Sequence, residues 1–200
     1  MNYIIQNYFK LKLTLASVML ALSLVAMAEK PDLKFKRIDT RNGLSNSQVN
    51  CILKDSKGFV WIGTKFGLNR YDGYRFLEFH SHVKDSTALI SDYVDNLYED
   101  IDGNIWVQQE TRFCIYNQKE EAFTQNLSPW LEKVGASGGV ERMYIDKAKN
   151  YWIKVWDGKL YYYNPRKNIK NSFDVANGKY GVGVGVNSFA SRGRSTVVMM

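Results

Sequence analysis

Short segments in which apolar and polar residues alternate follow one another after residue 48, and they predict strands. In the first stretch the predicted strands are Val49–Leu53, Phe59–Gly63, Leu68–Tyr71 and Tyr74–Phe79. Turn signals separate them, such as Asp55-Ser-Lys-Gly58 and Asp72-Gly73. An Asp side chain can accept hydrogen bonds from nearby backbone amides, and Gly tolerates positive φ. We therefore expect a four-stranded antiparallel unit joined by tight turns.

The same pattern returns twice, with strands that include Phe113–Tyr116 and Leu160–Tyr163. After residue 28 no stretch has a convincing helical period, so we expect no helix there. The three proline residues of the chain fall outside the predicted strands. The chain after residue 28 is therefore predicted to be all-β.

Three residue types recur in one phase along these segments. Tryptophan recurs at intervals of 45 and 46 residues, and an aspartate and a tyrosine keep the same intervals: Trp61, Trp106 and Trp152; Asp55, Asp100 and Asp146; Tyr71, Tyr116 and Tyr162. A fixed period of roughly 40–50 residues indicates stacked supersecondary units, and it is the length of a β-propeller blade.

The phase of these residues favours structural roles. One indole per unit can fill the gap between neighbouring sheets, although an exposed platform for carbohydrate stacking is the functional alternative. The three aspartates lie beside Gly or Asn in turns, and we expect them to be turn formers rather than acids or metal ligands.

The first 28 residues differ from the rest. Lys10 and Lys12 precede an uncharged stretch, 13–28, that ends in Ala26-Met-Ala28 before Glu29. A positive start, a short apolar core and such an exit predict a cleavable secretory signal peptide. The apolar stretch is shorter than the ~20 residues that span a bilayer comfortably, and an uncleaved anchor is the alternative.

Composition and the predicted export limit the binding partners and the site chemistry that this protein can have. The chain has 27 Lys and Arg against 20 Asp and Glu, and the basic residues are scattered, so we expect no nucleic-acid contact. The two cysteines, Cys51 and Cys114, fall on strands of different units and are expected to be buried free thiols rather than a disulfide. His80 and His82 are too few for a zinc site. We expect no catalytic residue, no metal and no cofactor.

The motifs of the first unit carry a family resemblance. Gly43-Leu-Ser-Asn46, Trp61-Ile-Gly-Thr64 and Tyr71-Asp-Gly73 resemble the two-component regulator propeller repeat. The resemblance covers about residues 35–163 and is densest in the first unit. In the second unit Gln108 and Gln109 stand where Gly63 and Thr64 stand in the first, and in the third Lys149 replaces the turn glycine.

This resemblance implies a periplasmic sensor. In hybrid two-component systems of Bacteroidetes, two propellers and a small β-sandwich sense glycan fragments, and a membrane helix leads to a histidine kinase, a receiver and a DNA-binding domain. The parent is implied to be anchored in the inner membrane and homodimeric, with an oligosaccharide as ligand. Phe35–Ile38 would form the outermost strand of the last blade.

Three units are too few for a closed ring, which has typically 4–8 blades. We therefore expect a partial, open β-propeller of about three four-stranded blades, and a truncated product or gene fragment of a larger sensor. The expected divisions are a signal peptide at 1–28, a lead-in strand at 29–48, blades at 49–88, 89–139 and 140–173, and a tail or the start of a further blade at 174–200.

Ligand contacts in a propeller come from the links between strands and between blades, not from the strand framework. The predicted contact residues are Lys65, Gln108, Gln109, Arg112, Trp130, Trp156 and Asp157. Trp156 is the strongest because it is an aromatic residue out of phase with the repeat, followed by Trp130 in the Ser128-Pro-Trp130 link. Ordinary loop packing is the alternative for each.

Two other function classes stay open. An exported propeller enzyme, such as a lyase or glycan hydrolase, would need paired carboxylates or a histidine on the ligand face, and the predicted loops offer Asp157 and Glu110 without a partner. A propeller that serves as a protein-binding scaffold is the other.

Overall fold

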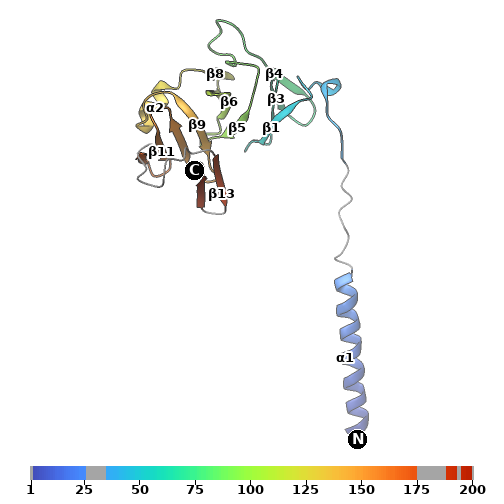
Figure 1. Cartoon of the computed structure of the whole chain (residues 1–200). Helices are drawn as coiled ribbons and strands as arrows, with labels where there is room; N and C mark the ends of the chain where they lie inside the picture. The colour runs from blue at the N-terminus through green and yellow to red at the C-terminus, as the bar shows by residue number, and fades with distance from the viewer. Residues whose placement is uncertain (1, 26–34, 175–187, 193–194, 200) are drawn as a thin grey trace. The chain divides into compact units, whose positions relative to one another are not determined.

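The computed structural model describes residues 2–25, 35–174, 188–192 and 195–199. The chain divides into two units, residues 1–37 and 38–200, which are considered separately. The first unit contains the helix α1 (Asn2–Val25), shown in Figure 1. Among the described residues, no helix combines the length and the apolar character that crossing a bilayer requires. The signal peptide stays a prediction, and its end at 26–28 lies outside the described residues.

The second unit is built from three four-stranded antiparallel sheets, each formed by strands in chain order. The first sheet contains β1 (Val49–Lys54), β2 (Val60–Thr64), β3 (Gly67–Tyr71) and β4 (Phe76–Phe79). The second contains β5 (Asn96–Glu99), β6 (Ile105–Gln109), β7 (Arg112–Asn117) and β8 (Ala122–Thr124). The third contains β9 (Val140–Ile145), β10 (Tyr151–Val155), β11 (Lys159–Asn164) and β12 (Ile169–Asp174). This open, propeller-like array confirms the predicted fold class.

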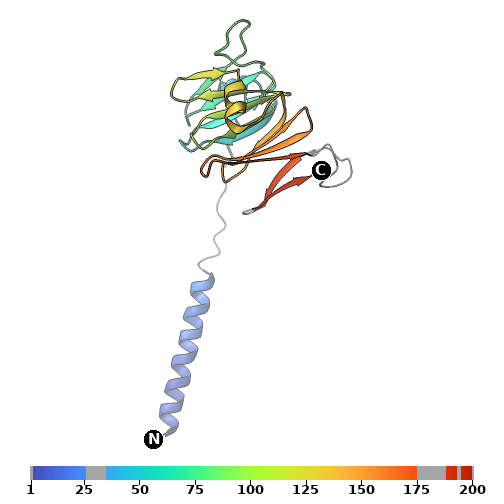
Figure 2. The same cartoon turned by 90° about the vertical axis from the view of Figure 1, so that its left-hand side faces the viewer.

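Three short elements complete the described chain. They are the 3-10 turn η1 (Thr40–Asn42), the helix α2 (Ser128–Val134) and the hairpin of β13 (Ser188–Arg192) with β14 (Ser195–Met199). Figure 2 shows α2 as the short yellow helix. The predicted strands lie within two residues of the observed ones, so the alternating pattern placed them well.

The aspartate of each repeat organises its turn, as predicted, and also holds the tryptophan. The Oδ1 atom of Asp55 accepts hydrogen bonds from the amides of Lys57 and Phe59 at 3.0 and 2.9 Å. Its Oδ2 atom accepts from Trp61 Nε1 at 2.8 Å. The corresponding indole bonds at Asp100 and Asp146 measure 3.0 and 3.4 Å. All three aspartates are buried, so each pair satisfies an indole N–H that would otherwise be costly to bury.

Two sheet junctions hold the core. In the first junction, between the first and second sheets, Trp61 packs against Tyr116 with ring centroids 5.1 Å apart. In the second junction, between the second and third sheets, Trp106 packs against Tyr151 at 5.7 Å. Both tryptophans are completely buried, which confirms the packing prediction for them. A fully buried aromatic side chain stabilises the fold by a few kcal/mol.

Trp152 does not follow this rule. Its side chain is half-buried and contacts Tyr162 of its own sheet, with ring centroids 4.7 Å apart and the ring planes tilted by 56°. The described residues form no fourth four-stranded sheet that could cover it. The prediction that each repeat tryptophan fills a gap between two sheets is therefore wrong for this copy.

The repeat tyrosine of the third sheet is Tyr163, so the prediction of Tyr162 is wrong by one position. Tyr71 and Tyr116 lie opposite the residue that precedes the repeat tryptophan, and in the third sheet Tyr163 lies opposite Tyr151 in the same way. The β10–β11 turn has one residue more than the two earlier turns, because Lys154 pairs with Leu160 whereas Gly63 pairs with Leu68. This insertion shifts the phase of the sequence pattern.

The helix α2 was not predicted. It has seven residues, with a proline in its first turn and Gly135 in the left-handed conformation at its C-terminal end. Two helical turns are too short to produce a recognisable period, and such a helix depends on tertiary packing. Here Leu131 and Val134 supply that packing, because both are buried in the second junction.

Phe35–Ile38 forms no strand, in contrast to the expectation from the family resemblance. A strand needs a neighbour to pair with its backbone. None of the three sheets pairs with this segment.

Candidate ligand-binding pocket

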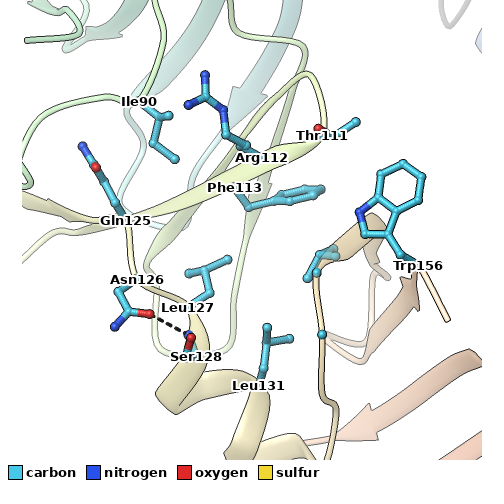
Figure 3. A pocket seen from close by; sticks show the side chains of 13 residues that line it. Ile90, Thr111, Arg112, Phe113, Gln125, Asn126, Leu127, Ser128, Leu131 and Trp156 are labelled. Carbon is cyan, nitrogen blue, oxygen red and sulfur yellow. Dashed lines mark hydrogen bonds between the residues drawn. The ribbon is translucent and has the colours of Figure 1, made fainter. Parts of the chain in front are cut away.

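A pocket of about 430 Å³ lies between the second and third sheets, at the end where the β6–β7 and β10–β11 turns meet the link before β9 (Figure 3). It is lined by residues 111–113, 125–128 and 138–140, together with Ile90, Leu131 and Trp156. Ligand pockets are typically about 300–1,000 Å³, so this volume is sufficient for a small ligand.

Trp156 forms one wall of the pocket. Its side chain is 63% exposed, and its amide donates a hydrogen bond to the carbonyl oxygen of Gly139 at 3.2 Å. A Cβ atom at position 139 would lie 2.9 Å from Cδ1 of the indole, so Gly139 leaves the space that the ring occupies. The β10–β11 turn thus presents an exposed indole to the pocket, whereas Phe66, the exposed aromatic residue of the β2–β3 turn, does not line it.

The floor of the pocket is apolar and its rim is polar. Phe113 is buried and points towards Trp156 in Figure 3, and Leu131 of α2 lies below them. Among the polar residues, Gln125 donates from Nε2 to the carbonyl oxygens of Asp85 and Ala88 at 3.1 and 3.0 Å. A hydrophobic floor with a few placed polar groups is the usual composition of a small-molecule site.

Arg112 is the charged residue of this lining. It is the first residue of β7, its side chain is exposed, and it forms no ion pair within the described part of the chain. The pocket thus brings together two of the residues predicted from the sequence, Arg112 and Trp156.

The other predicted contact residues lie elsewhere. Gln109 is completely buried, donates to the carbonyl oxygen of Ser91 and accepts from the amide of Ile90 at 3.3 Å, so its bonds hold the link between the first two sheets. Gln108 donates to the carbonyl oxygen of Glu110 at 3.2 Å. Lys65 and Asp157 are exposed in turns and do not line the pocket.

Trp130 packs inside the second junction. Its ring centroid lies 4.6 Å from that of Trp106 and 4.8 Å from that of Tyr151. This placement agrees with the alternative of packing, because the indole is covered by two aromatic rings.

Sequence reasoning missed Phe113, Gln125, Asn126 and Leu131 as pocket residues. Phe113 carries the apolar alternation of a strand, and residues 125–128 carry the turn-forming composition of an ordinary link. Nothing in the linear pattern indicates that these segments face Trp156.

Burial raises the pKa of several thiol and phenol groups in the core. Burial raises the pKa of both the Cys51 and Cys114 thiols to about 12, and both cysteines are free, as predicted. Burial, and after it the nearby Asp100 carboxylate, raises the pKa of Tyr151. Within the described residues no group of three or more His, Cys, Asp or Glu side chains is arranged to hold a metal ion.

Comparisons with known proteins agree with this architecture. Residues 43–66 match the two component regulator propeller family. The protein Histidine kinase P4 of Formosa agariphila is 39% identical over 70 residues, which are 35% of this chain and 5% of that protein. The matched region therefore spans a small part of this much longer relative.

Two solved structures from B. thetaiotaomicron match this chain, and the first of them is similar in fold. One is the extracellular domain of a protein assigned as a hybrid two component system, with a TM-score of 0.58, 20% identity, and coverage of 78% of this chain and 22% of that chain. A second such extracellular domain has a TM-score of 0.43, 15% identity, and coverage of 86% and 30%. The chain thus carries a two-component regulator propeller repeat within an open, propeller-like fold.

Proposed function

We propose that this chain is the ligand-sensing propeller part of a two-component regulator and that it binds an oligosaccharide in the pocket between the second and third sheets. The regulator repeat at residues 43–66 supports the sensor assignment. The pocket of about 430 Å³ with the exposed indole of Trp156 carries the assignment of the ligand site.

The chemistry of the pocket fits a sugar. A pyranose ring has an apolar face of C–H groups and a rim of hydroxyl groups. The indole face of Trp156 offers an apolar surface of matching size, and Thr111, Asn126 and Ser128 offer polar partners elsewhere in the lining. Stacking on one side and hydrogen bonding on the other is what such a ligand requires.

In this proposal the chain works outside the cytoplasm, and residues 1–28 are a cleavable signal peptide. Further blades and a histidine kinase portion of a larger, homodimeric receptor would carry the signal onward. The support is the likeness to extracellular domains of hybrid two component systems and to a histidine kinase.

The lining favours binding over hydrolysis. A glycosidase usually places two carboxyl groups on either side of the bond that it cleaves, about 5–10 Å apart. Neither Glu110 nor Asp157 lines the pocket. The residues that do line it supply stacking and hydrogen bonds.

The test is a calorimetric titration of the whole chain with a panel of neutral oligosaccharides based on glucose, xylose and galactose. For a saccharide that binds, we expect Trp156→Ala to weaken affinity about tenfold, because one stacked ring is lost. Phe66→Ala is the matched control, since Phe66 is an exposed aromatic residue, 56% accessible, in the corresponding turn of the first sheet. Equal affinity of wild type and Trp156→Ala would remove the pocket from the proposal.

A further inference from the structure

We infer that this pocket selects an anionic saccharide, and that the Arg112 guanidinium binds the carboxylate or sulfate group of that sugar. This inference rests on the proposed function, because it takes the pocket to be the saccharide site. It goes further by assigning a charge to the ligand and a partner to that charge.

The first observation is that the charge in the lining has one sign. The residues around the pocket include the cation Arg112 and no aspartate or glutamate. Glu110 lies two residues away, but it forms no ion pair with Arg112 and does not line the pocket. A concave site with one sign of charge attracts ligands of the opposite sign.

The second observation is that other cations placed at the sheet junctions are neutralised by protein groups. Arg70 lies 3.6 Å from a Glu121 oxygen and stacks over the rings of Phe59 and Trp61. Lys149 pairs with Glu99 at 2.7 Å. Arg112 has no such partner among the described residues, so its donors are available to a ligand.

The third observation is the position of Arg112 relative to the aromatic wall. Arg112 and Phe113 are consecutive in β7, and Phe113 points towards Trp156 across the pocket (Figure 3). The Arg112 side chain is directed to the side of Ile90 in Figure 3, so a saccharide stacked on Trp156 would extend across the pocket past β7 for its acidic group to reach the guanidinium. The planar guanidinium can donate two parallel hydrogen bonds to a carboxylate or a sulfate, which gives both affinity and geometric specificity.

Carboxylate and sulfate share this chemistry, and the experiment separates them. The whole chain is titrated with trigalacturonate, with its neutral methyl ester, with galactotriose 6-sulfate and with galactotriose. We expect at least one anionic probe to bind about tenfold or more tightly than its neutral counterpart. The anionic probe that binds identifies whether the acid is a uronate or a sulfate ester.

Arg112→Gln should remove the preference for the anionic probe, and Arg112→Lys should restore part of it, because lysine keeps the charge but loses the bidentate geometry. Lys65→Gln is the matched control, since Lys65 is an exposed cation in the corresponding turn of the first sheet and does not line the pocket. Raising the salt concentration from about 50 to about 500 mM should weaken binding of the anionic probe alone.

The inference would be overturned if the neutral probes bound more tightly than the anionic ones. It would also be overturned if Arg112→Gln lowered the affinity for neutral and anionic probes equally. In either case a loss of saccharide binding in Trp156→Ala would still support the proposed saccharide site. If none of the four probes binds at about 1 mM, the inference is overturned, and the proposed function is then judged by the neutral panel above.

Discussion

The two sheet junctions are built from the same repeat but are closed in different ways. In the first, Phe79 of β4 stacks on Trp61 at 5.9 Å, and Tyr116 and Phe123 complete the aromatic cluster. In the second, Trp130 takes the place beside Trp106 and comes from the helix α2 in the link. The first junction is thus filled by strand residues, whereas the second depends on an inserted element.

The length of the outer strand explains the difference. In the first sheet Phe79 lies opposite Leu68, at the end of β4. In the second sheet the last residue of β8 that pairs with β7 is Thr124, which lies opposite Ile115. If the pairing continued, Asn126 would lie opposite Phe113. Asn126 lies outside the strand and lines the pocket. The shortened outer strand therefore places no aromatic ring at the position that Phe79 has in the first sheet, and Trp130 of α2 fills the place beside Trp106 instead. Links between the strands of a rigid framework commonly carry function.

The largest expected loss of stability follows from replacing the tryptophan of the first junction. Trp61→Ala should lower the free energy of unfolding by about 3–5 kcal/mol, because it leaves a large cavity among buried rings. Trp152→Ala should cost less, about 1–2 kcal/mol, because that indole is half-buried. Urea unfolding of the whole chain, followed by circular dichroism, measures both. Equal costs would show that the two indoles are buried alike in solution. If Trp61→Ala does not fold, Trp61→Phe provides the same comparison at a smaller cost.

A smaller loss of stability is expected from a substitution in the turn that supports the tryptophan of the second junction. Asp100 accepts from the amides of Asp102 and Asn104 and from Trp106 Nε1. Asp100→Ala leaves these buried donors without their acceptor and should cost about 2–3 kcal/mol. Asp102→Ala, in the same turn with an exposed side chain, is the control and should change stability by less than about 0.5 kcal/mol. A cost for Asp100→Ala no greater than that of the control would mean that the turn does not secure the indole.

The smallest expected change in the free energy of unfolding is for a substitution of Glu99, which links both junctions. Its carboxylate accepts from the amide of Ser56 in the first sheet at 2.8 Å and from Lys149 in the third at 2.7 Å. Partial burial raises the pKa of Glu99, but these hydrogen bonds outweigh burial and hold the pKa below its ordinary value. A carboxyl group with a lowered pKa stabilises the fold above its unfolded pKa of about 4.3, and this stabilisation is lost as the pH falls through the folded pKa.

Glu99→Gln should therefore cost about 1 kcal/mol at pH 7 and less in acid, below about pH 4. Glu120→Gln is the control, because the Glu120 side chain is exposed and forms no ion pair with the described residues. Urea unfolding at pH 7 and pH 3.5 measures both variants. A cost for Glu99→Gln that stays constant or grows towards acid would contradict the role given to the ionised carboxylate.

The repeated core could be predicted from the sequence because its signals are local. Alternation marks strands, and Asp55 and Gly58 mark a turn through interactions within a few residues of one another. The fixed spacing of Trp61 and Trp106 then predicts that each indole fills a junction between successive sheets, as both do. Lys149 shows the limit of this reasoning: it adopts a positive φ of 63° where the other copies have glycine, and its ammonium group gains the Glu99 carboxylate.

The pocket could not be predicted, because it is formed by contacts between segments that are distant in the sequence. Arg112 and Trp156 could each be selected as link residues, but only the packing of the second sheet on the third brings them to one cavity. The sequence by itself determined the three β-units, their turns and the buried Trp61 and Trp106, since these follow from short-range periodicity. The tertiary structure decided that a two-turn helix supports Trp106 and that the indole of Trp156 forms a wall of the pocket. Both depend on which space the neighbouring sheet leaves unfilled, and no local pattern records that space.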